Sequence, residues 1–196
     1  MKQVLIIHGG TSFSSYDAYL SHLMHMNMDY VRLKSRSSWK DLLRTQLTHT
    51  DILVPSMPNT ANANYDEWVI IFEKIIPFFS DDVQLVGHSL GAMFLAKYLQ
   101  DHQLKQPVKR LILLAGAYDD ESMEDLGSFK VESATNVSHS AQEVHLFHSK
   151  DDLVVPFSEL AKFQADMPDA ITHTFTDRGH FNTETFPELL ELLQNK

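Results

Sequence analysis

The chain has 196 residues, no cysteine and a formal net charge of −10 at neutral pH. This length fits a single domain, residues 1–196, which can bury a core without the help of disulfides or metals. The absence of cysteine excludes a disulfide framework, thiol catalysis and a cysteine-based zinc site. The negative charge disfavours nucleic acid and anionic membranes as partners, because both require clustered Lys and Arg. The one mildly basic stretch, residues 32–40, is too short to change this conclusion.

Neither a targeting sequence nor a membrane span is indicated by the hydrophobic pattern. The apolar run at residues 4–7 is much shorter than the hydrophobic region of a secretory signal. No other run approaches the ~20 apolar residues that cross a bilayer. We therefore expect a cytoplasmic protein.

Short apolar runs rich in β-branched residues alternate along the chain with longer segments of helical periodicity. The expected strands are residues 4–7, 52–54, 83–86, 111–114, 144–147 and 171–175. Apolar side chains recur at helical spacing, which predicts helices with one apolar stripe each at residues 16–23, 68–79 and 186–193. A buried helix is expected at residues 92–100. Two more are expected after Ser38, where Asp41 three residues on resembles a capping box, and around Pro156, which suits a first helical turn.

This alternation of strands and helices predicts an α/β fold. The expected arrangement is a single-domain, doubly wound, mainly parallel sheet with helices on both faces. In such folds, ligands bind at the carboxyl ends of the strands. Residues 116–143 break the alternation, since they are polar and acidic. They form either a small lid or excursion over the strand ends or a surface loop with no role.

The motif Gly-His-Ser-Leu-Gly at residues 87–91 follows an expected strand and precedes an expected helix. A sharp turn there needs glycine on both sides, because Cβ atoms would clash as strand and helix approach each other. The turn exposes Ser89 at the start of a helix, where backbone N–H groups and the helix dipole favour negative charge. We therefore predict that Ser89 is a catalytic nucleophile. The alternative is a tight turn without any chemistry.

A serine hydroxyl needs a base to take its proton, and His180 is the best placed of the 11 histidines. It follows the last expected strand and precedes the last expected helix, so its loop overhangs the strand ends. Gly179 allows an unusual backbone angle next to it. Five other histidines lie within or near expected helices and strands and are taken as surface or core residues: His22, His25, His102, His145 and His148. None has the spacing of a metal site, so we expect no metal.

The acid that orients the base should lie between the nucleophile and the base in chain order. Two adjacent aspartates, Asp151 and Asp152, follow the expected strand at residues 144–147. Asp119, after the expected strand at residues 111–114, is a third candidate. The residues alone leave the choice among the three open.

An oxyanion hole requires two backbone N–H donors that point at the charge developing on the substrate. One should be Leu90, directly after the nucleophile. The second should come from the loop His-Gly-Gly-Thr at residues 8–11, after the first strand. Gly10 is our choice there, and Thr11 is the alternative.

These motifs resemble the α/β-hydrolases and, among them, the small bacterial serine hydrolases related to the retinoblastoma-binding-protein-type hydrolase. The similarity covers nearly the whole chain in the same order: residues 57–59 followed by Trp68, residues 87–92, the Asp-Asp-x-x-x-Pro stretch at 151–156, and Gly-His-Phe at 179–181. In this family the second aspartate is the triad acid, so the resemblance implies Asp152. It also implies ester-type hydrolysis without a cofactor.

We therefore predict a cofactor-independent serine hydrolase that acts on small carboxylic esters, or on related thioesters or amides. In this hypothesis Ser89 attacks the substrate, His180 transfers the proton, Asp152 holds the imidazole, and an acyl-enzyme forms. An alternative is a protein-binding module that retains the fold but has little turnover. A third hypothesis is perhydrolase-like use of the same triad.

Overall fold

The computed structural model describes residues 2–34 and 37–195, so Ser35 and Arg36 of the basic stretch lie outside the described residues. Within these ranges, six strands form one parallel sheet in the order β2-β1-β3-β4-β5-β6. All six predicted strands are present: β1 (Lys2–Ile7), β2 (Thr50–Leu53), β3 (Val83–His88), β4 (Val108–Leu114), β5 (Ala141–Ser149) and β6 (Ile171–Phe175). Several are longer than predicted, because the hydrogen-bonded ladder continues into polar residues that an apolar pattern does not mark.

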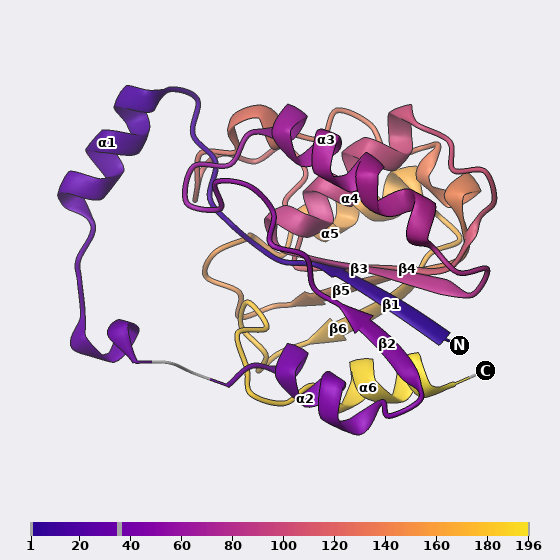
Figure 1. The fold of residues 1–196 in the computed structure, drawn as a ribbon. Helices are drawn as coiled ribbons and strands as arrows, with labels where there is room; N and C mark the ends of the chain where they lie inside the picture. The colour runs from indigo at the N-terminus through magenta and orange to yellow at the C-terminus, as the bar shows by residue number, and fades with distance from the viewer. Residues whose placement is uncertain (1, 35–36, 196) are drawn as a thin grey trace.

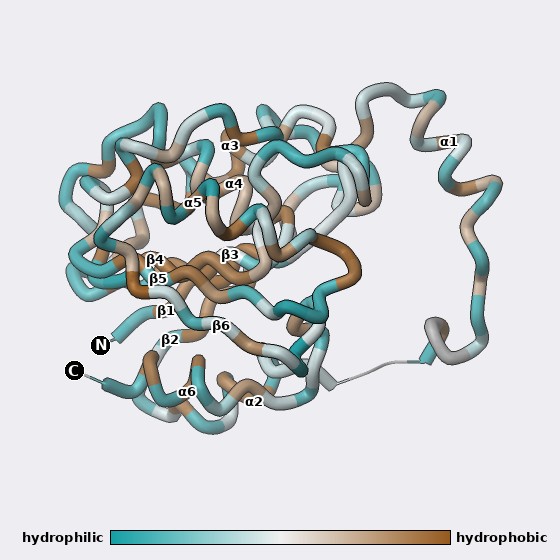
Figure 2. Tube along the Cα trace, turned by 180° about the vertical axis from the view of Figure 1, so that it is seen from behind, coloured by the Kyte–Doolittle hydropathy of each residue, from teal (hydrophilic) through white to brown (hydrophobic). Residues whose placement is uncertain are grey.

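Helices cover both faces of the sheet, which confirms the predicted doubly wound α/β fold (Figure 1). One face carries α3 (Tyr65–Ile75), α4 (Leu90–Asp101) and α5 (Glu159–Asp166), and the other carries α2 (Trp39–Gln46) and α6 (Pro187–Gln194). Side chains alternate between the two faces along each strand. In β1, Leu5 and Ile7 pack with α3 and α4, whereas Val4 and Ile6 pack with α2 and α6. The hydrophobic strands lie between the two helical layers (Figure 2).

The observed helices differ from the predicted ones at two prolines. The helix α3 ends at Ile75 and a 3₁₀ turn follows, because Pro77 cannot continue the hydrogen-bond ladder of an α-helix. The second difference is at Pro156, which precedes α5 instead of lying in its first turn. The Pro156 carbonyl accepts the Glu159 N–H at 3.0 Å, and the helix begins at Glu159.

The helix α1 (Tyr16–His25) forms where it was predicted, but its apolar stripe does not face the core. None of its residues is buried, and Tyr16 and Met24 are 65% and 75% exposed. Figures 1 and 2 show this helix standing clear of the layered body of the protein. Periodicity predicts that a helix has an apolar face, but not what lies against it. No helix in the described part of the chain is long and apolar enough to cross a membrane.

Of residues 116–143, the last three begin β5, and the segment before them lies against the face of the sheet that α3 and α4 cover. Phe129 in this segment contacts the rings of Tyr65 and Trp68 of α3, with centroid distances of 5.9 and 5.0 Å. Further apolar side chains of the segment join the core on that face: Leu126, Val131, Ala134 and Val137. The acidic part, residues 119–125, stays exposed or half-buried near the strand ends.

The strand order places a topological switch point between β1 and β3. The chain leaves β1 for β2 on one side and then crosses to β3 on the other side of β1. In parallel sheets, such a point opens a crevice at the carboxyl ends of the strands. The two segments that meet here are the loop after β1, residues 8–11, and the turn after β3 that contains Ser89.

We expect the apolar stripes of α1 and α6 to differ in their contribution to stability. Leu189 of α6 is 0% exposed, so Leu189→Ala should lower the free energy of unfolding by about 3 kcal/mol. Leu20 of α1 is 38% exposed, so Leu20→Ala should change it by less than about 0.5 kcal/mol. Urea unfolding followed by circular dichroism measures both values. A loss above about 1.5 kcal/mol for Leu20→Ala would show that α1 packs against the domain.

Candidate active site

Ser89 lies in the turn between β3 and α4, in a backbone conformation that serine rarely adopts. Its φ and ψ are 56° and −122°, in a region where a side chain is strained. Backbone hydrogen bonds hold this conformation. The Ser89 N–H donates to the Leu114 carbonyl at 2.8 Å, and the Ser89 carbonyl accepts the Ala92 N–H at 2.9 Å. The residue is half-buried at the carboxyl end of β3.

The glycines on both sides of Ser89 are required by space. A Cβ atom on Gly87 would lie 2.5 Å from the Gly91 carbonyl oxygen. A Cβ atom on Gly91 would overlap the carbonyl of Ile7 at the end of β1. Both positions therefore exclude every side chain, and the cause is the Cβ clash that the sequence motif predicts.

His180 lies in the loop between β6 and α6, between two residues with positive φ. Gly179 has a φ of 51° and Phe181 a φ of 53°. The sequence predicts the unusual backbone angle at Gly179, but nothing in it indicates the positive φ of Phe181. Phe181 is fully buried, and its ring packs against Phe175 and Phe186 with centroid distances of 5.6 and 5.1 Å. This packing stabilises the strained backbone beside His180.

Asp152 is the aspartate whose carboxylate reaches His180. Its Oδ2 lies 2.8 Å from Nδ1 of His180, and its Oδ1 accepts the N–H groups of Val154 and Val155 at 2.8 and 3.0 Å. Burial opposes the charge of this carboxylate, but the His180 bond and the backbone N–H donors outweigh burial and lower the pKa of Asp152. Asp152 is therefore ionised at neutral pH. Its Oδ2 accepts the hydrogen bond from Nδ1 of His180, so the ring presents Nε2 on its opposite edge.

The other two candidates for the acid bind elsewhere. Asp151 Oδ1 accepts the Gly179 N–H at 3.0 Å, so this carboxylate supports the loop that carries His180. Asp119 forms an ion pair with Lys162 of α5. Both carboxylates are thus engaged with partners other than the imidazole ring.

His88, inside the Gly-x-Ser-x-Gly motif, is a buried partner of the His180 loop. Its Nε2 donates to the His180 carbonyl at 2.8 Å. Burial lowers the pKa of His88 to about 3, and the nearby charges of Lys40 and His180 act in the same direction. The ring is therefore neutral, with its proton on Nε2. From the other side, the Trp39 indole N–H donates to the Phe181 carbonyl at 3.0 Å, so the loop is held by both β3 and α2.

The loop after β1 is fixed by the ring of His8. Its Nε2 accepts the Met57 N–H at 3.1 Å, and its Nδ1 donates to the Gly9 carbonyl at 2.7 Å. Both ring nitrogens are thus satisfied in one neutral tautomer. A Cβ atom placed on Gly9 would lie 3.5 Å from Ser89 Oγ, which shows how closely the loop passes the serine.

Of the two candidates for the second oxyanion donor, Thr11 is already engaged. Its N–H donates to the Thr60 carbonyl at 2.8 Å. The N–H groups of Gly10 and Leu90 have no acceptor among the described residues. A Cβ atom on Gly10 would lie 2.7 Å from the Thr60 carbonyl oxygen, so the loop requires glycine at this position. The geometry therefore favours Gly10 over Thr11.

Two hollows of very different size meet at Ser89. The larger is a cavity of about 380 Å³, and its lining includes Gly10, Lys40, Ser89, Glu124, His180 and Asn182. The smaller, of about 20 Å³, has a mixed wall: apolar residues such as Leu90, Met93 and Val154 line it together with the acidic residues Asp120, Glu124 and Asp125. It has room for about one water molecule. Glu124, in the acidic part of residues 116–143, borders both hollows.

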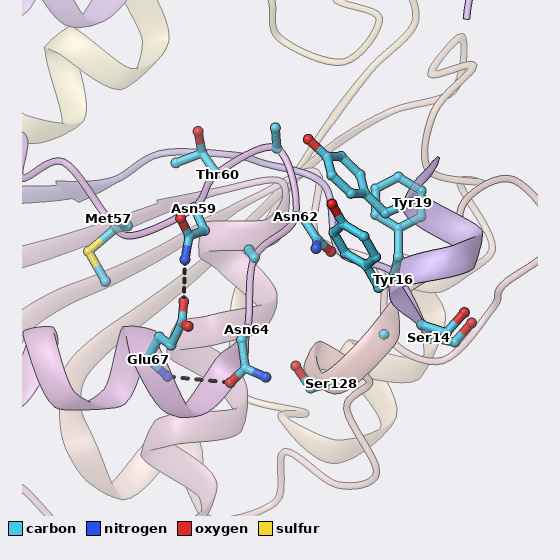
Figure 3. A pocket seen from close by; sticks show the side chains of 15 residues that line it. Ser14, Tyr16, Tyr19, Met57, Asn59, Thr60, Asn62, Asn64, Glu67 and Ser128 are labelled. Atoms are coloured by element: carbon cyan, nitrogen blue, oxygen red, sulfur yellow. Dashed lines mark hydrogen bonds between the residues drawn. The ribbon is translucent and has the colours of Figure 1, made fainter. Parts of the chain in front are cut away.

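The largest cavity found among the described residues, of about 1050 Å³, is not part of this site. It lies between the start of α1 and the loop from β2 to α3, and none of Ser89, Asp152 and His180 lines it. Figure 3 shows amide, hydroxyl and tyrosine side chains around it, with the Asn59 amide bonded to the Glu67 carboxylate at 2.9 Å. The Asn64 side chain caps α3, since its Oδ1 accepts the N–H groups of Asp66 and Glu67 at 2.9 and 3.4 Å.

The remaining histidines occupy surface or core positions, as predicted. Exposed positions are taken by His22 and His25 on α1 and by His102 after α4, whereas His145 and His148 are buried in β5. Among residues 2–34 and 37–195, no three His, Asp or Glu side chains are close enough to hold a metal ion.

Three supporting residues escaped the sequence analysis. His88 stands inside the motif that identified Ser89, but its role depends on a carbonyl 92 residues away in the chain. Trp39 and Lys40 open the helix that the Ser38 and Asp41 pair predicted. That pair signals a helix start, and only the fold shows that the start lies beside His180.

The fold and this geometry define the class of the protein. The crystal structure of the ydeN gene product from Bacillus subtilis is similar, with a TM-score of 0.78 at 24% identity, covering 98% of this chain and 97% of that one. The esterase Pf2001 of Pyrococcus furiosus gives a TM-score of 0.61 at 15% identity, covering 98% and 82%. At these identities the likeness shows the fold alone, and that fold is the α/β-hydrolase fold.

Sequence comparison identifies the family. The serine hydrolase family model matches residues 32–194, so the chain belongs to the serine hydrolase family and is a hydrolase. The protein YdeN of Bacillus subtilis (strain 168) is 28% identical over 187 residues, which cover 92% of this chain and 86% of that protein. Serine hydrolase RBBP9 of Rattus norvegicus is 27% identical over 155 residues, which cover 76% and 80%.

We expect the buried His88 to make stability depend on pH. The unfolded chain takes up a proton on this residue at the ordinary histidine pKa near 6.5, whereas the pKa in the folded protein is lowered to about 3. Between these values the unfolded state binds more protons. The free energy of unfolding therefore falls as the pH decreases, by up to about 1.4 kcal/mol per pH unit from His88 alone. Urea unfolding between pH ~7 and ~5 measures this slope.

His88→Gln is the matched variant for this measurement. A glutamine amide can donate to the His180 carbonyl but does not titrate. The stability of His88→Gln should therefore decline less steeply with decreasing pH than that of the wild type. Equal slopes in the two proteins would show that His88 keeps an ordinary affinity for protons when folded.

Proposed function

We propose that this protein hydrolyses small carboxylic esters through Ser89, His180 and Asp152, without a cofactor. The observation that carries the proposal is the hydrogen bond of 2.8 Å between Asp152 and His180, beside a cavity that His180 shares with Ser89. This arrangement provides a nucleophile, a base and an acid that orients the base. Membership in the serine hydrolase family supports the reaction class. Related thioesters and amides would need the same groups.

In the proposed reaction, Nε2 of His180 takes the hydroxyl proton as Ser89 Oγ attacks the ester carbonyl carbon. The N–H groups of Gly10 and Leu90 bind the negatively charged oxygen of the tetrahedral intermediate, and each such donor contributes roughly 10²–10³ in rate. His180 then gives the proton to the departing alcohol, and an acyl-enzyme on Ser89 remains. A water molecule activated by the same histidine releases the acid and restores the serine.

The two hollows support a short acyl group. The leaving alcohol must lie against His180, which delivers its proton, and His180 lines the cavity of about 380 Å³ but not the smaller hollow. The acyl group then enters the hollow of about 20 Å³ next to Leu90 and Met93. Space of this size holds about one water molecule, and a methyl group is of similar size. Acetyl esters are therefore the first substrates to test.

Family membership favours this function over the hypothesis of a protein-binding module. The proposal includes a cytoplasmic location and a small-molecule substrate, with neither nucleic acid nor membranes as partners. The net charge of −10 supports the exclusion of those two polyanionic partners.

The proposal is tested with a fluorophosphonate probe and 4-nitrophenyl acetate. The wild type should be labelled at Ser89, which peptide mass spectrometry identifies, and should hydrolyse the ester. Ser89→Ala should lose the label and at least about 10³-fold in kcat, because the proposed reaction uses the Ser89 hydroxyl as its nucleophile. Ser133→Ala, which removes a hydroxyl that lines neither hollow at Ser89, serves as control and should keep both properties. Absence of labelling at Ser89, or unchanged turnover in Ser89→Ala, would refute the proposal.

A second prediction separates the two adjacent aspartates. Asp152→Asn should lower kcat by about 10³–10⁴-fold, because an amide favours the wrong tautomer of His180. Asp151→Asn should lower it by less than about tenfold, because the His180 loop keeps its bonds to His88 and Trp39. Steady-state kinetics on 4-nitrophenyl acetate compare the two variants. Losses of equal size would contradict the role given to Asp152.

A further inference from the structure

The cavity lined by Ser89 and His180 is also lined by a lysine, Lys40. Lys40 lies in the first turn of α2, a helix on the opposite face of the sheet from α4. The proposed ester hydrolysis gives no task to this lysine. Its positive charge nevertheless lies close enough to the site to help lower the pKa of the buried His88, which binds the His180 carbonyl.

Trp39 fixes the position of Lys40. It is 1% exposed, its indole N–H donates to the Phe181 carbonyl at 3.0 Å, and its backbone N–H donates to the Thr183 carbonyl at 3.1 Å. The first turn of α2 is therefore tied to the loop that carries His180. The Lys40 ammonium lies over the Trp39 ring, 4.9 Å from its centroid, in a cation–π contact.

No carboxylate among the described residues forms an ion pair with Lys40. The neighbouring Asp41 accepts the Ser38 N–H at 3.0 Å and lies 3.7 Å from Arg44. Lys40 is half-buried, and this burial lowers its pKa, while the charge of Asp41 acts in the opposite direction. A cation that has lost part of its water and has no paired anion gains from an anionic partner that enters the cavity.

The position of Lys40 indicates which part of the proposed substrate it can contact. Of the two hollows at Ser89, Lys40 lines the larger, with His180 and Asn182, and not the smaller. It also lines a neighbouring hollow beside Asn182 that Ser89 does not reach. The larger cavity holds the leaving alcohol, because His180 must protonate the alcohol oxygen. A group bound by Lys40 therefore belongs to the alcohol part of the ester.

We propose that Lys40 binds an anionic group, a carboxylate or a phosphate, on the alcohol part of the substrate. This inference rests on the proposed function, since it assigns a substrate class to the same site. The substrates are then acetyl or similarly short esters of hydroxy acids or of phosphorylated alcohols. Hydrolysis breaks the acyl–oxygen bond with water and releases a short carboxylic acid and an alcohol that carries the negative group.

Glu124 gives the proposal a second readout of opposite sign. It lines the same cavity as Lys40 and comes from a different segment of the chain. Its carboxylate repels a substrate anion in the cavity, whereas Lys40 attracts it. Removing the charge of Glu124 should therefore favour anionic substrates, and removing that of Lys40 should disfavour them.

Three acetyl esters of similar shape test the proposal: 4-acetoxybenzoate, 4-acetoxyphenyl phosphate and the neutral methyl 4-acetoxybenzoate. For each protein, the measured quantity is kcat/KM for an anionic ester divided by kcat/KM for the neutral ester. Lys40→Met should lower this ratio about tenfold, the effect of one charge-assisted hydrogen bond. Lys40→Arg should keep it within about threefold of the wild type, and Glu124→Gln should raise it about twofold. A loss confined to one anionic ester identifies the carboxylate or the phosphate as the bound group.

Arg44→Met is the matched control. It removes a positive charge from the same helix, but Arg44 lies beside Asp41 and does not line the cavity. Its ratio should stay within about twofold of the wild type. A ratio for Lys40→Met within about twofold of the wild type would overturn the proposal, and so would an equal drop in Arg44→Met.

Failure of the proposed function has a different signature, because the wild type would then hydrolyse none of the three esters. Titration calorimetry with 4-hydroxybenzoate and with 4-hydroxyphenyl phosphate tests the anion site independently of turnover. Weaker binding of either compound to Lys40→Met than to the wild type supports the proposal, and equal binding of both overturns it.

Discussion

The rest of the structure depends on the close approach of the start of α4 to the end of β1. A Cβ atom at Gly91 would overlap the Ile7 carbonyl, so backbone packs directly on backbone at the switch point of the sheet. This approach brings the turn of Ser89 beside the loop of Gly9 and Gly10. The strained φ of 56° at Ser89 persists because the following helix is buried almost completely along its first two turns. The proposed nucleophile and the proposed oxyanion donors thus lie together at one rigid corner of the core.

His180, the proposed base, is positioned in a different way. The loop of His180 belongs to no helix or strand, and contacts from separate elements determine its shape. Asp152 binds the imidazole, His88 binds the His180 carbonyl, and Trp39 binds the next carbonyl along the chain. The orientation of the base is therefore coupled to the packing of α2, whose first turn also brings Lys40 into the cleft. The start of α2 thus helps to position His180 through Trp39, and it adds a positively charged residue, Lys40, to the lining of the larger cavity.

The parts of the site that depend on local sequence could be predicted, and the parts that depend on long-range contacts could not. The turn at Ser89 follows from two glycines between a strand and a helix, and the six strands follow from their apolar runs. Asp151 and Asp152 are equivalent by position in the chain. They differ because the Val154 and Val155 N–H groups fix the carboxylate of Asp152 in a turn that points it at His180. The exposure of α1 also escaped prediction, because periodicity does not indicate which surface a helix contacts.

The charge of Lys40 and the neutrality of His88 are linked in a way that bears on substrate binding. The positive charge of Lys40 helps to lower the pKa of His88 to about 3, but burial is the larger cause. A substrate anion beside Lys40 would cancel part of its field and would therefore raise the pKa of His88. Because burial alone still opposes protonation, His88 would remain neutral near pH 7 and keep its bond to the His180 carbonyl. The cleft can therefore accept a negative group next to the base without disturbing the hydrogen bonds that orient the base.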